Sequence, residues 1–349
     1  MPANIVHMLT AHKAIQKLKE KNIEEFTQFA EMLDDISARN CRAYLNLGSI
    51  GPDLYYYVKR LRLLKDLLFD KFVQAKGVTP WSYHLHSHQP NVFPLRLLQI
   101  MFSDVIRKNG KTELEDDDIR KLAYIAGHLT HIAADQIIHP VVNSVAGPYY
   151  RSGENRREHR ECEVFQDYFL YQEVYREEKK FGAEYDFLKQ KFHKWVDCVK
   201  GVTIKNSEDW FRYFLQRGFI ETYGSSPSEK IIENSADNLL LMLRICLIRG
   251  PYKEAAEDYR KNGCDKGMCR KYIKDVDYLK HWHVAVKLSV IYLQALYEVY
   301  CVLKEGKDFT EKHKQRFLKI VGNADLSCPL EQNIFEKAKD ALEEKKSIK

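Results

Sequence analysis

Four ionisable side chains lie close together in the stretch GHLTHIAADQIIHP, residues 127–140: His128, His131, Asp135 and His139. The apolar residues between them recur at helical spacing, so the stretch predicts a buried helix. At 100° per residue, His131, Asp135 and His139 follow one another by one turn and lie within about 80° on one face. Two imidazoles and a carboxylate in this arrangement suit a metal ion. His128 shares the face and fits a structural role equally well.

Ligand-type side chains recur at other points of the N-terminal half. In RREHRECEVFQDYF, His159 and Glu163 are again four residues apart, the spacing of a zinc half-site. Asp53 follows Pro52 at the start of an expected helix, where first-turn N–H groups could also hold it as an N-cap. In SYHLHSHQPNVF, three imidazoles at alternate positions precede a helix; in an extended segment they would point the same way, and in a loop any one of them could be a ligand. The further histidine candidates are His84, His86 and His88 in this segment, and His7 in NIVHMLTAH.

Each of these residues has a simpler interpretation when it is taken alone. A single histidine is more often a hydrogen-bonded core residue than a ligand, and His159 with Glu163 could be a surface ion pair. The combination argues otherwise, because burying several ionisable groups without a cation between them would cost many kcal/mol. With a divalent cation between them, burial of these groups becomes favourable instead of costly. The ligand-type residues on these two helices are too many for one tetrahedral ion, so we expect two or three metal ions.

The elements that must position these residues are helices. Apolar spacing predicts them over residues 4–20, 23–38, 53–75, 93–109, 115–139, 157–180, 207–221, 229–249, 277–304, 309–321 and 331–345. Alternating strand-like runs are nearly absent, which predicts an all-α fold. Pro140 is expected to end or bend the helix that carries His139. At 349 residues the chain is long enough for two lobes, a metal-binding core over residues 1–175 and a helical extension over 176–349 that completes or covers the cleft.

Composition indicates a soluble globular protein. Charged residues make up 30% of the chain, the mean hydropathy is −0.47, and no run of about 18 uncharged apolar residues predicts a transmembrane helix. The N-terminal segment is amphipathic from its start and lacks the pattern of a signal peptide, so we expect a cytoplasmic protein. The net charge of +6 is modest and forms no arginine stripe, which argues against a nucleic-acid partner. Cys264 and Cys269 lack a second pair nearby and are expected to be free thiols.

The order of these residues resembles the zinc-dependent phospholipase C family. This family includes the bacterial secreted phospholipases C and the N-terminal domain of glycosylphosphatidylinositol-specific phospholipase D. The resemblance covers about residues 4–170 and rests on HMLTAHKAIQKL and GHLTHIAADQIIH in combination with the G-x-x-PD turn and the H-x-x-x-E pair. It implies an all-helical bundle, related more distantly to the single-strand-specific zinc nucleases, with an additional C-terminal helical lobe.

The resemblance also implies roles for the residues. Asp135 would bridge two zinc ions, and His131 with His86 or His88 would complete one of those sites. A second ion would be held by His139, His159 and Glu163. His7 would hold the third ion with help from Asp135, and Asp53 would act as base or ligand.

The expected function is metal-dependent hydrolysis of a phospholipid-like or other phosphodiester. Clustered zinc ions clamp phosphate oxygens and activate a water, which Asp53, or Asp135 through the bridge, would orient or deprotonate. A non-catalytic, metal-stabilised binding protein is the alternative. A single-strand nuclease ranks lower, because no basic groove with interleaved aromatics is evident. The basic stretches KRLRLLK (59–65) and RKYIK (270–274) could contact an anionic membrane surface, although such runs are usually solvated helix faces.

Overall fold

The fold is helical throughout the part of the chain that is described. The structure, a computed structural model, describes residues 4–35, 39–57, 80–109, 114–149, 151–175, 209–249, 251–322 and 334–344, and these ranges contain helices and no strand. The prediction of an all-α fold is confirmed.

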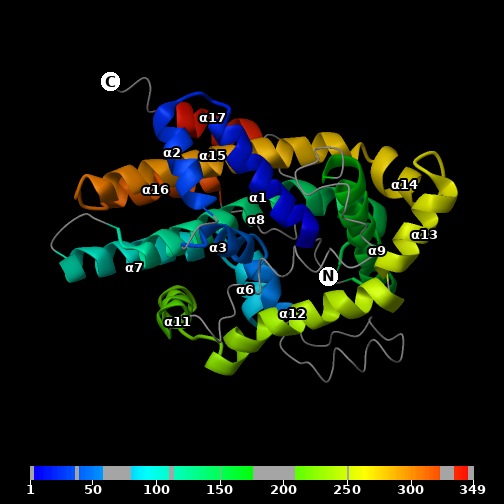
Figure 1. The fold of residues 1–349 in the computed structure, drawn as a ribbon, viewed down its shortest axis with the longest axis horizontal. Coiled ribbons are helices and arrows are strands. Elements are labelled where there is room, and N and C mark those ends of the chain that lie inside the picture. Colours follow the sequence, from blue (N-terminus) through cyan, green and yellow to red (C-terminus); the bar gives the residue numbers. More distant parts are fainter. Residues whose placement is uncertain are drawn as a thin grey trace.

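The centre of the molecule is α8 (Asp116–Ala146), which packs along α15 (Tyr278–Lys304) (Figure 1). Helices α1 (Asn4–Lys19) and α3 (Cys41–Ser49) pack against α8, and α9 (Gly153–Leu170) contacts both α8 and α1. A reciprocal capping box between Glu115 and Asp118 starts α8, and Gly147, with a φ of 72°, follows its last residue. One apolar core joins helices from both halves of the chain.

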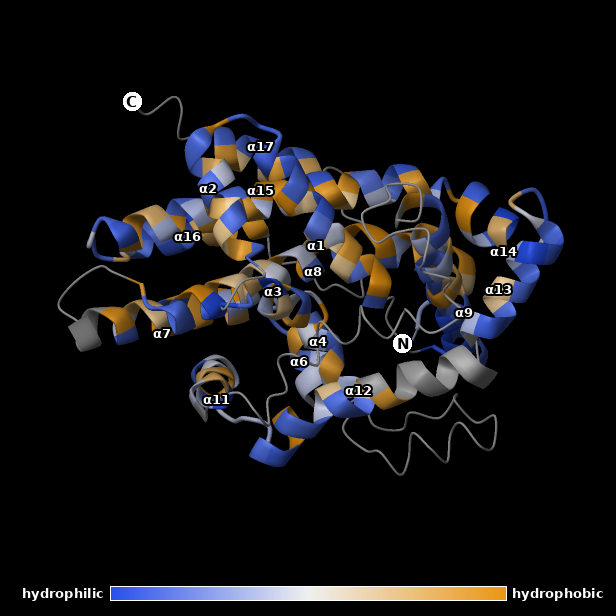
Figure 2. Cartoon of the chain, in the orientation of Figure 1, coloured by the Kyte–Doolittle hydropathy of each residue, from blue (hydrophilic) through white to orange (hydrophobic). Residues whose placement is uncertain are grey.

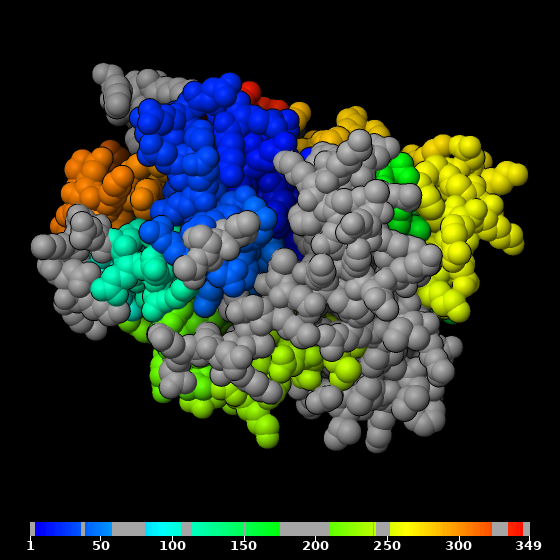
Figure 3. Space-filling model, viewed as in Figure 1, coloured from blue at the N-terminus to red at the C-terminus, as the bar shows by residue number. Residues whose placement is uncertain are grey.

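The remaining helices surround this centre. In Figure 2, α7 and α15 show apolar positions interspersed with hydrophilic ones, the pattern of helices that are buried on one side. On the face drawn in Figure 3, the residues of α1, α2 and α3 (blue) lie between α16 (orange) and α13 with α14 (yellow). The bounds are α2 (Glu24–Leu33), α4 (Gly51–Leu54), η1 (Tyr55–Tyr57), α6 (Pro80–Ser87), α7 (Val92–Asn109), η2 (Tyr171–Tyr175), α11 (Asp209–Tyr223), α12 (Glu229–Arg249), α13 (Pro251–Asn262), α14 (Gly267–Cys269), η3 (Arg270–Lys274), α16 (Glu311–Val321) and α17 (Ile334–Glu343).

Helix α15 is the one described helix that is long and apolar enough to cross a membrane, with a mean hydropathy of 1.4 over its most apolar window. In the structure 61% of that window is buried, and the helix packs on α8 and α1. Trp282 of α15 also donates a hydrogen bond from Nε1 to Thr10 Oγ1 of α1, at 3.1 Å. In this structure α15 is therefore a core helix.

Three local predictions differ from the structure. Helix α8 does not end at Pro140 but continues to Ala146, because the ring removes only one backbone donor while α9 and α15 pack on either side of the helix. The segment from Pro80 to Ser87, expected to be extended or a loop, is helix α6. Helices α3 and α13 were not predicted. The predicted helices over 23–38, 53–75, 157–180, 207–221 and 331–345 lie partly outside the described residues.

Helices α3 and α8 cross in close contact at two glycines. A Cβ atom at Gly48 would lie 2.0 Å from the carbonyl oxygen of Tyr124, and one at Gly127 would lie 2.0 Å from that of Leu45. Only glycine permits so close an approach of two backbones. The crossing holds the C-terminal end of α3 against the part of α8 that carries His131.

We expect Gly127→Ala to lower the free energy of unfolding by about 2 kcal/mol or more, because the new methyl group overlaps a backbone atom that cannot move alone. Gly218→Ala in α11 is the matched control: its Cβ would meet side-chain atoms of Leu97 and Phe93 and no backbone atom, so side-chain shifts can relieve part of the overlap, and alanine favours helix by about 1 kcal/mol. Urea unfolding of both variants measures the difference. Equal stability of the two variants would contradict the role of the crossing.

Candidate metal centre

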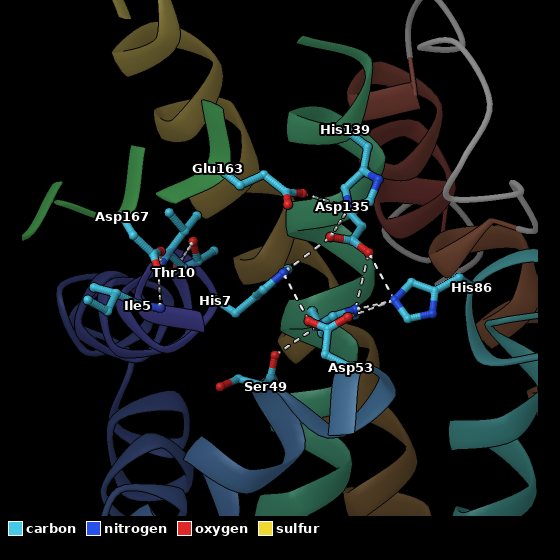
Figure 4. A network of polar contacts seen from close by, with 12 residues as sticks. Ile5, His7, Thr10, Ser49, Asp53, His86, Asp135, His139, Glu163 and Asp167 are labelled. Carbon is cyan, nitrogen blue, oxygen red and sulfur yellow. Dashed lines mark hydrogen bonds and ion pairs between the residues drawn. The ribbon is translucent and has the colours of Figure 1, made fainter. Parts of the chain in front are cut away.

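Eight of the nine predicted metal ligands converge in one buried cluster. Helix α8 supplies three of them from consecutive turns, α9 supplies two, and α1, α4 and α6 supply one each. Figure 4 shows six of the side chains gathered around Asp135: His7, Asp53, His86, Asp135 itself, His139 and Glu163. Because the ligands come from five helices, the cluster forms only when the fold is complete. The eight residues are His7, Asp53, His86, His131, Asp135, His139, His159 and Glu163.

The carboxylate of Asp135 lies at the centre of the cluster, and each of its oxygens faces two imidazole nitrogens. Oδ1 is 3.3 Å from Nε2 of His7 and 3.2 Å from Nε2 of His139. Oδ2 is 3.1 Å from Nε2 of His131 and 3.6 Å from Nε2 of His86. Neither oxygen accepts a hydrogen bond of regular geometry. This is the arrangement of a carboxylate that can bridge two cations.

Two histidines on one side of Asp135 are oriented by backbone carbonyls. Nδ1 of His131 lies 2.9 Å from the carbonyl oxygen of Ser49, and Nδ1 of His86 lies 2.7 Å from that of Ser82. Since a carbonyl only accepts, each Nδ1 is the donor, and in a neutral imidazole Nε2 is left with its lone pair. The two Nε2 atoms are 3.3 Å apart, and that of His86 is 3.1 Å from Asp53 Oδ1. Lone pairs that face each other and a carboxylate require a proton or a metal ion between them.

The other side of the cluster joins α8 to α9. Nε2 of His159 is 3.0 Å from Oε1 of Glu163, and the same oxygen is 3.9 Å from Nε2 of His139. Ser152 fixes the start of α9, because its hydroxyl accepts a hydrogen bond from the backbone N–H of Asn155 at 3.0 Å. His139 is also the most exposed member, with 20% of its side chain accessible, whereas Asp135 is 1% exposed. The cluster therefore opens to solvent at His139.

Burial and neighbouring charge shift the pKa values in opposite directions. Burial and His131 lower the pKa of His7 to about 4. Burial opposes protonation of His139, but Asp135 outweighs it and raises the pKa of His139 to about 9. Burial would raise the pKa of Glu163, but His159 outweighs it and the pKa falls to about 2. The histidines around Asp135 likewise hold the pKa of that carboxyl well below its usual range. The centre thus favours ionised carboxylates with positive charge between them.

The ligand set fits zinc. Ligand atoms at about 2.0–2.1 Å around a tetrahedral zinc ion lie about 3.4 Å from one another, and the nitrogen–oxygen separations around Asp135 are 3.1–3.6 Å. Imidazole and carboxylate are the donors that zinc takes. Three groups have ligand atoms within 4.8 Å of one another: His7, His131 and Asp135; Asp53, His86 and His131; His139, His159 and Glu163.

His84, His88 and His128 lie outside the cluster, and Asp53 lies within it but not as the N-cap that the sequence allowed. Residues 84, 86 and 88 lie at and just beyond the end of α6, where alternate positions point to different sides. His88 is accordingly exposed, and its ring lies beside those of His84 and Tyr223. His128 is buried beside Phe93 without a hydrogen bond. Asp53 lies inside the short helix α4 and makes no N-cap hydrogen bond.

Some residues that shape the centre were not found from the sequence. Their contribution comes from backbone atoms, as at Ser49 and Ser82, for which a side-chain motif gives no signal. Asp167 did carry a signal, since it continues the spacing of His159 and Glu163 by another turn of α9. Its carboxylate is buried and holds the start of α1.

Two other sequence features take no part in the cluster. Cys264 and Cys269 are free thiols, as predicted, with their sulfur atoms 2.8 Å apart, and no metal-type group within the described residues includes a cysteine. The cationic side chains of the stretch RKYIK pair with acidic residues, Lys271 with Glu158, Lys274 with Asp265, and Arg270 with Asp275. The stretch KRLRLLK lies outside the described residues.

Comparison with known proteins gives one family. The sequence model of the zinc-dependent phospholipase C family matches residues 6–213, more than half of the 349-residue chain, and the match includes every member of the cluster. Comparison with curated proteins and with solved structures finds no match.

We expect the protein, once stripped of metal by a chelator, to lose stability as the pH rises from 6.5 towards 9. On the acid side the effects oppose one another: the lowered pKa values of His7, about 4, and Glu163, about 2, reduce stability as the pH falls, whereas burial raises the pKa of Asp167 to about 7 and this acts in the opposite direction. As pH rises from 6.5 to about 9, folded His139 loses its stabilising proton. Urea unfolding across this range should show a fall of about 1–3 kcal/mol towards pH 9, and His139→Gln should flatten that limb. Stability that keeps rising to pH 9 would contradict this account.

Proposed function

Because the chain belongs to the zinc-dependent phospholipase C family, we propose that it is a zinc-dependent phosphodiesterase that cleaves a phospholipid-like substrate. The observation that carries the proposal is the pair of Nε2 atoms on His86 and His131, 3.3 Å apart and directed at buried carboxylates. Both Nδ1 atoms are committed to carbonyl oxygens. Buried imidazoles in this arrangement are suited to a metal ion.

The ligands support two or three zinc ions. Asp53, His86, His131 and Asp135 would hold one, with Asp135 shared between sites, and His139, His159 and Glu163 would hold another. His7 faces the remaining oxygen of Asp135 and would hold a third. Bound zinc would neutralise the phosphate oxygens and lower the pKa of a bound water.

Asp53 and Asp135 would have different roles in the reaction. Asp53 Oδ2 is buried and accepts no hydrogen bond, so it is available to orient a water and to take its proton. Asp135 would fix the ligands on both sides of it. A zinc ion held by Asp53, His86, His131 and Asp135 would have all four tetrahedral positions taken by the protein. A zinc ion held by three residues keeps one position open, as catalytic zinc sites do. The phosphodiester would therefore enter at His139, the exposed edge of the cluster.

Zinc binding and hydrolysis are tested together with two histidines at the end of α6. We expect His86→Ala to lose about one zinc equivalent by elemental analysis and to cleave bis(p-nitrophenyl) phosphate at least about 100-fold more slowly. His88→Ala, a change in an exposed histidine two residues away, should keep the zinc content and rate of the wild type. A chelator should abolish the wild-type rate and added zinc should restore it. Wild-type protein with less than about one zinc per chain would overturn the proposal.

Asp53→Asn separates catalysis from metal binding. The amide keeps the shape and one oxygen that can still bind zinc, although more weakly than the carboxylate does, but it cannot take a proton. With zinc added in excess to keep the site filled, we expect the rate to fall by about 10²–10⁴. A wild-type protein that carries zinc but cleaves neither this diester nor a phospholipid would favour the non-catalytic binding protein instead.

A further inference from the structure

Asp167 ties the helix that carries His7 to the helix that carries Glu163. It lies one turn beyond Glu163 on α9, as Glu163 lies one turn beyond His159. Its Oδ1 accepts a hydrogen bond from the backbone N–H of Val6 at 2.8 Å, and its Oδ2 accepts one from that of Ile5 at 3.2 Å. The side chain has no exposed surface. Figure 4 shows it beside the start of α1, next to Ile5.

These two bonds satisfy donors that the helix itself leaves free. The first N–H groups of a helix have no partner within it, and the positive end of the helix dipole favours a carboxylate there. Ile5 and Val6 lie in the first turn of α1 and directly precede His7. The position of His7 relative to α9 therefore depends on Asp167.

A third contact holds the carboxylate itself in place. The hydroxyl of Tyr252, on α13, donates a hydrogen bond to Asp167 Oδ2 at 2.6 Å, and Tyr252 is 1% exposed. Helix α13 packs against α9. Asp167 thus has three donors from two other elements and is fixed on both of its oxygens.

We propose that Asp167 is a positioning residue, which places His7 against Asp135 by binding the first N–H groups of α1. The inference rests on the zinc-binding function proposed above. A carboxylate outside the ligand set would thereby set the affinity for one particular zinc ion. The site of Asp53, His86 and His131 contains no residue of α1 and meets it only through the ring of His7, which stacks on that of His131 with centroids 4.1 Å apart, so we expect its affinity for zinc to change by a few-fold at most.

Thr10 offers a matched control on the same helix. It is buried, its hydroxyl donates to the carbonyl oxygen of Val6 at 2.7 Å, and it accepts a hydrogen bond from Trp282 of α15 at 3.1 Å. Thr10→Val therefore removes buried hydrogen bonds from α1 without touching the contact to α9. A general loosening of α1 would affect zinc binding in this variant as well.

The test is a zinc titration of the full chain after chelator treatment, in competition with a chromophoric chelator. In Asp167→Ala we expect one zinc equivalent to bind about 10- to 100-fold more weakly, with the other equivalents bound within a few-fold of the wild type. Thr10→Val should match the wild type at every equivalent. Tyr252→Phe, which leaves both backbone bonds in place, should stay within a few-fold of it.

The outcomes separate this inference from the function on which it rests. If wild-type protein binds no zinc, both fail. If it binds zinc and Asp167→Ala binds every equivalent as the wild type does, or if Thr10→Val shows the same loss, only the positioning role is overturned. Should Asp167→Ala not fold, Asp167→Asn carries the test, because its single carbonyl oxygen cannot replace both acceptors and should weaken the same equivalent about tenfold.

Discussion

The buried carboxylate of Asp135 is the group around which the rest of the structure is arranged. It is 1% exposed, yet it is held among four imidazoles rather than in an apolar environment. A buried carboxylate without compensating positive charge would be strongly unfavourable. The cluster contains two more carboxylates, Asp53 and Glu163. Neutral histidines carry no charge and therefore cannot balance the negative charge of three carboxylates. A fold that gathers three buried acids at one point needs cations there, and imidazole nitrogens are placed to share them.

The scaffold explains how five helices can hold these groups within a few ångströms. The glycine contact between α3 and α8 lets a carbonyl oxygen at the end of α3 reach His131. Two hydrogen bonds join helices of the second half of the chain to helices that carry ligands. Trp282 of α15 donates one to Thr10 of α1, and Tyr252 of α13 donates the other to Asp167 of α9. The ligands come from the first half of the chain, and helices from the second half pack against the helices that carry them.

The sequence predicted those ligands that follow one another by helical turns along a single helix. His131, Asp135 and His139, and again His159 and Glu163, follow helical turns, so their convergence could be anticipated from the chain alone. His86 and His88 could not be told apart, because that choice depends on whether the segment is extended or helical. Helix α3 was missed, and with it the carbonyl of Ser49, since a backbone acceptor leaves no mark in the sequence. The prediction that the helix ends or bends at Pro140 was wrong about its end, because the packing of α9 and α15 against α8 outweighs one lost hydrogen bond and α8 continues to Ala146.

The pKa shifts of the histidines agree with the geometry in marking the positions around Asp135 as sites for positive charge. Acidic neighbours raise the pKa of His131 and bring that of His139 to about 9, although both are set among buried groups that oppose charge. His7 and His159, which are shifted the other way, are driven towards the neutral form that binds metal. Protons and zinc ions therefore compete for the same positions, those that surround Asp135. Because imidazolium must release its proton before it can become a ligand, zinc binding at this centre is coupled to proton release, and the carboxylate that attracts the proton is also the one that retains the metal.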